Sequence, residues 1–145
     1  NMENQLLRII HHNTDEWFAQ GVSEDSLQIL NKVVYKGMGD ISASAVQWYL
    51  RNILFFEQGF QLNKNVLLIS YEKLVNNPQS EVKNICNFIG IPFQKKMADG
   101  IFSSSINKKT SPVLDSKIEL LCDGLQIRFK NIIASFHHNL NNHNA

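Results

Sequence analysis

One apolar run, VLLIS at Val66–Ser70, limits what this chain can form. The run is continuous rather than alternating and has the length of a β-strand, so it predicts a strand covered on both faces, as in a parallel sheet. A strand needs neighbours for its backbone N–H and C=O groups. No second run of this quality occurs in the 145 residues. The sheet must therefore be completed by another copy of the chain or by strands outside this sequence.

The rest of the chain shows apolar residues at helical spacing. Ser23 and Asn77 are good N-caps, and Gly90 is a good helix end. The predicted helices cover residues 3–20, 24–36, 42–59, 78–89, 93–99 and 115–136, and residues 100–113 are predicted to be a loop. The fold-class prediction is mainly α with one strand.

Helical periodicity also predicts which side chains form the core. The residues expected to be largely buried are Trp48, Ile53, Leu68, Ile85, Phe88, Leu121 and Leu125. By length, the chain is one domain that can bury a core of ordinary size.

Composition excludes several classes of protein. A hydrophobic content of 43% and a charged content of 19% describe a globular domain. The net charge of +1 gives no reason to expect nucleic acid or a membrane surface as a partner. Cys86 and Cys122 lie on apolar helical faces, so we expect two buried free thiols in a cytoplasmic protein, with a disulfide as the alternative. The sequence has no spacing typical of metal ligands, so no metal site is predicted.

The stretch after the predicted strand carries a recognisable pattern. Its distinctive positions are Tyr71, Glu72, Leu74, Asn77, Pro78, Ile85, Phe88, Gly90 and Pro92, preceded by Trp48 and followed by the loop SSSINKKTSP. Over about residues 45–130 this pattern resembles the C-terminal signature of sulfotransferases that use 3′-phosphoadenylyl sulfate (PAPS). The pattern is specific as a combination, whereas each element alone would be weak. The chain departs from it at Ser70, where the family often has Arg, and at Lys73, where it has an acid.

The resemblance implies a fold and a set of contacts. The fold would be the C-terminal portion of a P-loop-like three-layer α/β sulfotransferase. Lys108 and Lys109, with Ser105 in the same loop, would contact the 3′-phosphate of PAPS, with a solvent-exposed basic loop as the alternative. Tyr71 and Glu72 would have a structural role at the end of the strand.

Other parts of the family site have no counterpart in the sequence. In the family, a loop rich in Gly, Ser and Thr after the first strand holds the 5′-phosphosulfate through backbone N–H groups. The segment KGMGDISAS has glycines and serines, but it follows a helix, so we do not interpret it as this loop. No Arg/Ser pair for the 3′-phosphate and no catalytic base were identified, and no catalytic residue is predicted.

The functional hypothesis follows from the resemblance. The chain would be the C-terminal part of an enzyme that transfers a sulfuryl group from PAPS to a hydroxyl or amine of a small-molecule or carbohydrate acceptor, and it would be inactive alone. Residues 3–60 would form a helical substrate-side region, residues 61–138 a strand–helix–loop–helix region, and residues 139–145 a frayed tail. The alternative is a non-catalytic helical scaffold or partner-binding module, whose sheet a homo-oligomer would complete.

Overall fold

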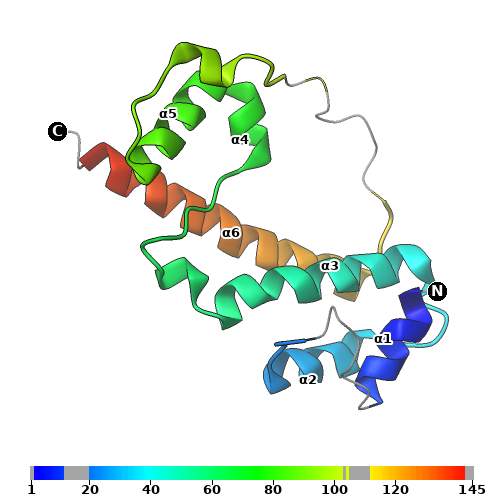
Figure 1. Cartoon of the computed structure of the whole chain (residues 1–145). Helices are drawn as coiled ribbons and strands as arrows, with labels where there is room; N and C mark the ends of the chain where they lie inside the picture. Colours follow the sequence, from blue (N-terminus) through cyan, green and yellow to red (C-terminus); the bar gives the residue numbers. More distant parts are fainter. Residues whose placement is uncertain (1, 12–19, 103, 105–111, 143–145) are drawn as a thin grey trace. The chain divides into compact units, whose positions relative to one another are not determined.

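The structure is a computed structural model that describes residues 2–11, 20–102, 104 and 112–142. Within these ranges the chain forms helices and no β-strand. The elements are α1 (Met2–Ile10), α2 (Glu24–Val33), α3 (Gly39–Glu57), η1 (Phe60–Leu62), α4 (Tyr71–Asn76), α5 (Pro78–Ile89), η2 (Lys95–Ala98) and α6 (Ser116–Asn142) (Figure 1). The contacts divide the chain into two units, Asn1–Asn63 with Pro112–Phe129 and Lys64–Ser111 with Lys130–Ala145.

The core of the first unit is built from one face each of α1, α2, α3 and the first half of α6. Its largest fully buried side chains are Leu6, Ile9, Leu30, Val46, Leu50 and Ile118. Each side chain of this kind contributes about 1.5–3 kcal/mol on burial. The Cys122 Sγ lies 3.6 Å from the Ala45 carbonyl oxygen, which places α6 directly beside α3 here (Figure 1).

The second unit has a smaller core between α4, α5 and η2. Val75, Cys86, Ala98 and Ile133 are its buried apolar side chains among the described residues, and the Cys86 Sγ lies 3.7 Å from the Met97 Sδ. α5 has the predicted bounds, because Pro78 suits a first helical position and Gly90 ends the helix with φ 75°. Both thiols are buried and free, as predicted.

The predicted strand at Val66–Ser70 is wrong for the chain as described. These residues form an irregular segment in which Val66, Leu67 and Leu68 are half-buried. Ser70 has extended backbone angles, φ −89° and ψ 128°, but no segment within the described ranges pairs with it or with the residues before it. A strand is defined by its ladder, and the apolar run alone cannot supply one.

The polar stretch after this segment contains a helix that the sequence did not predict. α4 begins directly after Ser70, whose Oγ accepts a hydrogen bond from the Lys73 backbone N–H. A Ser before a short run of helix-compatible residues is an N-cap signal. The signal was present at Ser70, but no helix was predicted between the strand at Val66–Ser70 and the helix at residues 78–89.

The core prediction is correct in part. Ile53 and Leu125 are buried, and Leu121 packs partly against the core. The prediction for Trp48 is wrong, since 38% of its surface is exposed. It lies on the side of α3 away from the buried face. Three predicted core residues are half-buried rather than buried: Leu68, Ile85 and Phe88. The last two lie on α5, in the unit with the smaller core.

The last helix is longer than predicted, because α6 runs from Ser116 to Asn142. The backbone of residues 139–142 is thus helical, and residues 143–145 lie outside the described ranges. No helix among the described residues is both long and apolar enough to cross a membrane.

Candidate functional site

The residues predicted to contact the 3′-phosphate cannot be placed. Ser105, Lys108 and Lys109 all lie outside the described residues. Their role as nucleotide contacts stays a prediction.

Tyr71 and Glu72 lie in the first turn of α4, where their neighbours give Glu72 a local structural role. The Ser70 Oγ donates to the Glu72 carboxylate at 2.8 Å and accepts from the Lys73 N–H at 3.3 Å. The backbone N–H of Glu72 itself, then the Ser70 hydroxyl, hold the pKa of this carboxyl below its ordinary value. The Lys130 charge also lowers this pKa, whereas partial burial of the carboxyl raises it. This ionised carboxylate at a helix N-terminus is favoured by the helix dipole.

The glycine turn before α3 binds an anion that belongs to the chain itself. Gly37 and Gly39 have φ of 91° and 78°, conformations that favour glycine. Their N–H groups donate to the two carboxylate oxygens of Glu3, at 2.7 and 3.1 Å. Because Glu3 already accepts from these donors, the turn offers no ready cradle for a phosphate group.

Glu57, near the end of α3, makes a second carboxylate contact that sequence reasoning missed. It accepts from the Ser23 N–H at 3.1 Å and from the hydroxyls of Ser23 and Ser26. The Ser23 Oγ also accepts from the Ser26 N–H, so Ser23 is the N-cap that the sequence predicts. The carboxylate therefore joins the C-terminal end of α3 to the N-terminus of α2, where a negative charge is favoured.

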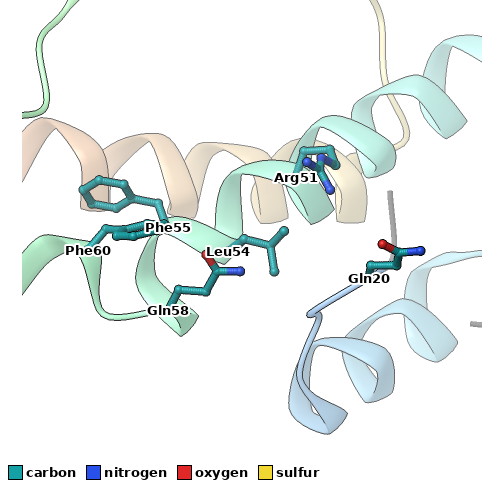
Figure 2. Close-up of a pocket in the computed structure, with 6 residues that line it drawn as sticks. All are labelled: Gln20, Arg51, Leu54, Phe55, Gln58 and Phe60. Carbon is teal, nitrogen blue, oxygen red and sulfur yellow. The ribbon is translucent and has the colours of Figure 1, made fainter. Parts of the chain in front are cut away.

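A cavity of about 460 Å³ lies beside the C-terminal half of α3. Its lining residues are Gln20, Arg51, Leu54, Phe55, Gln58 and Phe60. Figure 2 shows Arg51 and Leu54 on α3 and Gln58 directly after its last residue, with Gln20 on the separate segment that leads into α2. The six described residues that line it all belong to the first unit. Sequence reasoning did not identify this cavity.

One wall of the cavity continues into a cluster of aromatic rings. The Phe55 ring lies 6.1 Å from the Phe60 ring, 5.5 Å from the Phe129 ring and 5.2 Å from the Phe56 ring. The Arg128 guanidinium carbon lies 3.9 Å above the centre of the Phe56 ring, a cation–π contact. These ring contacts restrain the position of the Phe55 ring.

A second cavity, of about 430 Å³, lies at the N-terminal end of α3. Its lining residues are Asp40, Ile41, Ser44, Ala45, Pro112 and Leu114. The Ser44 hydroxyl donates to the Asp40 carbonyl oxygen at 2.7 Å, so it is engaged within its own helix. This cavity is the more apolar of the two, and none of its lining residues that the structure describes is a cation.

Burial also shifts the pKa of two groups in the core of the first unit. Burial is the main cause that raises the pKa of the Tyr49 hydroxyl, and it likewise raises the pKa of the Cys122 thiol. A raised thiol pKa leaves little thiolate at neutral pH, so Cys122 is a poor nucleophile. No cluster of metal-ligating side chains occurs among the residues that the structure covers.

The chain matches the family model for the sulfotransferase domain over residues 11–128, more than half of its length. The chain therefore belongs to the sulfotransferase domain family. The match begins well before residue 45, where the resemblance that we recognised in the sequence begins. No curated protein and no solved structure matched the chain.

Proposed function

We propose that this chain is the C-terminal part of a sulfotransferase that transfers a sulfuryl group from PAPS to a hydroxyl or amine. The observation that carries the proposal is the match to the sulfotransferase domain over residues 11–128. The first unit would form part of the pocket that binds the sulfuryl acceptor. The loop that contains Ser105, Lys108 and Lys109 would cover the 3′-phosphate of the donor.

The described residues alone do not fit the donor. The glycine turn that precedes α3 donates its N–H groups to Glu3, and the basic loop lies outside the described ranges. Under this proposal, a loop upstream of this sequence would hold the 5′-phosphosulfate. No step of the transfer is assigned to a residue here.

Calorimetry with adenosine 3′,5′-bisphosphate tests the proposal. One basic loop supplies about 1–3 kcal/mol through charge-assisted hydrogen bonds. A millimolar dissociation constant already requires about 4 kcal/mol. We therefore expect this chain alone to bind more weakly than millimolar and to transfer no sulfate. Micromolar binding by this chain alone would contradict the proposal that most of the nucleotide site lies outside this sequence.

A chain extended upstream to include a strand–loop–helix unit provides the positive test. It should bind the nucleotide, and replacing Lys108 and Lys109 together with alanine should weaken that binding. The matched control is the double alanine variant of Lys95 and Lys96, which removes the same charge from η2. Equal losses in both variants would show that the predicted loop does not contact the phosphate.

The second candidate is a non-catalytic module that binds another copy of the chain or a partner protein. It is favoured by apolar side chains that the second unit leaves exposed, among them Ile89 at 56% and Ile91 at 43%. Light scattering across a concentration series separates the two candidates. A stable oligomer that gains no nucleotide affinity in the extended chain would favour the module.

A further inference from the structure

The second unit contains two sulfur atoms in contact, and they come from two different elements. The Cys86 thiol on α5 donates to the thioether of Met97 in η2, with 3.7 Å between the Sγ and Sδ atoms. The two side chains differ in exposure, because Cys86 is 3% exposed and Met97 is 39% exposed. A small reagent in solution therefore reaches the Met97 side chain, whereas the thiol beneath it is covered.

The contacts that hold η2 against α5 are of modest strength. The Gln79 side-chain amide donates to the Lys95 carbonyl oxygen at 3.4 Å, beyond the usual length of such a hydrogen bond. Ala98 is buried, but its side chain is a single methyl group. Met97 is the largest apolar side chain of η2, so its contact with Cys86 is an important part of this attachment.

Oxidation changes the character of a methionine side chain. A peroxide transfers one oxygen atom to the thioether sulfur, which is oxidised, while the O–O bond breaks and the other oxygen leaves as water. The product, methionine sulfoxide, is polar. Water is a better donor to its oxygen than the weak S–H group of Cys86. An oxidised Met97 therefore turns toward solvent, and the Cys86 thiol loses the group that covers it.

We propose that Met97 is a reversible oxidation site for peroxides and that its oxidation uncovers the Cys86 thiol. Methionine sulfoxide reductases reverse this modification in proteins, so they would restore the contact. A further consequence, weaker nucleotide binding, rests on the function proposed above, because η2 precedes the loop that contains Lys108 and Lys109. The modification itself does not depend on that function.

Graded hydrogen peroxide followed by peptide mass spectrometry tests the first step on the unchanged protein. The chain has three methionines, which provide the comparison. Met38 is 7% exposed in the core of the first unit, and Met2 packs partly against the same core. Because the susceptibility to oxidation follows exposure, we expect Met97 to gain oxygen about tenfold faster than Met38. Oxidation of Met38 as fast as that of Met97 would overturn the proposal.

Maleimide labelling after removal of the peroxide tests the second step. A buried thiol reacts only through local opening, so loss of its cover should make Cys86 react about tenfold faster. Cys122, which is buried in the first unit, is the internal control and should keep its rate. Treatment with a methionine sulfoxide reductase should return Cys86 to its original rate. An unchanged rate at Cys86, or an equal acceleration at both cysteines, would refute the proposal.

Two substitutions assign the effect to Met97. Met97→Leu keeps an apolar side chain of similar volume without the sulfur, so peroxide should not accelerate the labelling of Cys86 in this variant. Met97→Gln places a polar group at the same position and should label rapidly without peroxide. Acceleration by peroxide in Met97→Leu would assign the effect to another residue. Slow labelling in Met97→Gln would show that a polar side chain here does not uncover the thiol, and either result contradicts the proposal.

The consequence for nucleotide binding is measured in the chain extended upstream. Peroxide should lower the affinity for adenosine 3′,5′-bisphosphate in the wild type and leave it unchanged in Met97→Leu. An extended chain that never binds the nucleotide, while its Cys86 labelling still responds to peroxide, would refute the proposed function and leave the oxidation site standing.

Discussion

At the scale of single residues, the first unit depends on carboxylates that bind donors at the start of a helix or turn. Glu57 is the clearest case, because it accepts from three donors of Ser23 and Ser26. Ser26 is only 3% exposed, so its hydroxyl has little access to water as a substitute partner. Hydrogen bonds to a charged group contribute about 1.5–3 kcal/mol, and a buried donor left alone carries a similar penalty.

We therefore expect Glu57→Ala to lower the free energy of unfolding by about 2–3 kcal/mol. Urea denaturation followed by circular dichroism measures the change. Glu119→Ala, at an exposed position on α6, is the control and should change stability by less than about 0.5 kcal/mol. A loss in Glu57→Ala no larger than that of the control would show that the hydrogen bonds of Glu57 to Ser23 and Ser26 contribute nothing to stability.

Gly21 is a residue whose left-handed backbone conformation restricts the side chain, although an added Cβ would make only ordinary contacts. Its φ is 81°, and an added Cβ would lie 3.4 Å from the Gln58 Nε2 and 3.7 Å from a Leu54 methyl carbon. The left-handed conformation costs about 1–2 kcal/mol for a residue with a side chain. Gly21→Ala should therefore destabilise the protein by about that amount.

Gly124 supplies the opposite control, because it lies inside α6 with nothing within 4 Å of an added Cβ. Gly124→Ala should stabilise by about 0.5–1 kcal/mol, the difference in helix propensity. Thermal melts of the two variants should thus shift in opposite directions. Shifts of the same sign would mean that the turn at Gly21 tolerates alanine.

At the scale of elements, α4 is short and depends on its cap. Ser70→Ala removes the hydroxyl that caps α4 and that donates to Glu72. A lost N-cap costs about 1 kcal/mol. The variant should also raise the pKa of the Glu72 carboxyl toward its ordinary value, since one of the two main causes of its lowering is gone.

The sign of the pH effect follows from the direction of that shift. Because folding lowers the pKa of Glu72, its contribution to stability is complete above the ordinary pKa of a glutamate. The contribution is lost as the pH falls through the folded-state pKa. Carboxyl titration by NMR in the wild type and in Ser70→Ala measures the shift. An unchanged Glu72 pKa would show that the Ser70 contact does not form in solution.

The same elements show what the sequence could and could not predict. α5 was predicted to the residue, because Pro78 and Gly90 are local signals that act at the chain's own backbone. The strand at Val66–Ser70 failed because pairing is not local, and an apolar run cannot specify its neighbour. The cavity was missed because Arg51 and Gln58 interrupt a helix that is apolar over most of its surface. Their spacing of seven residues, which places both on one face, was the available signal.

At the scale of the whole molecule, we predict that a further strand pairs with Val66–Ile69. Three of these side chains are half-buried and the segment is apolar, yet no backbone hydrogen bond joins it to another described part of the chain. Backbone N–H and C=O groups that have no hydrogen-bond partner in the chain favour the addition of a strand. Such a strand could come from a second copy or from an upstream segment of the same protein.

Hydrogen exchange distinguishes these sources. In the dilute chain, the amide protons of Val66–Ile69 should exchange far faster than those in the middle of α5, because only the latter are held in a helix. If a second copy supplies the strand, protection of Val66–Ile69 should rise with protein concentration. If an upstream segment supplies it, protection should appear only in the extended chain and should not depend on concentration. Slow exchange in the dilute chain would contradict both, since it would require a partner for these amides within the 145 residues themselves.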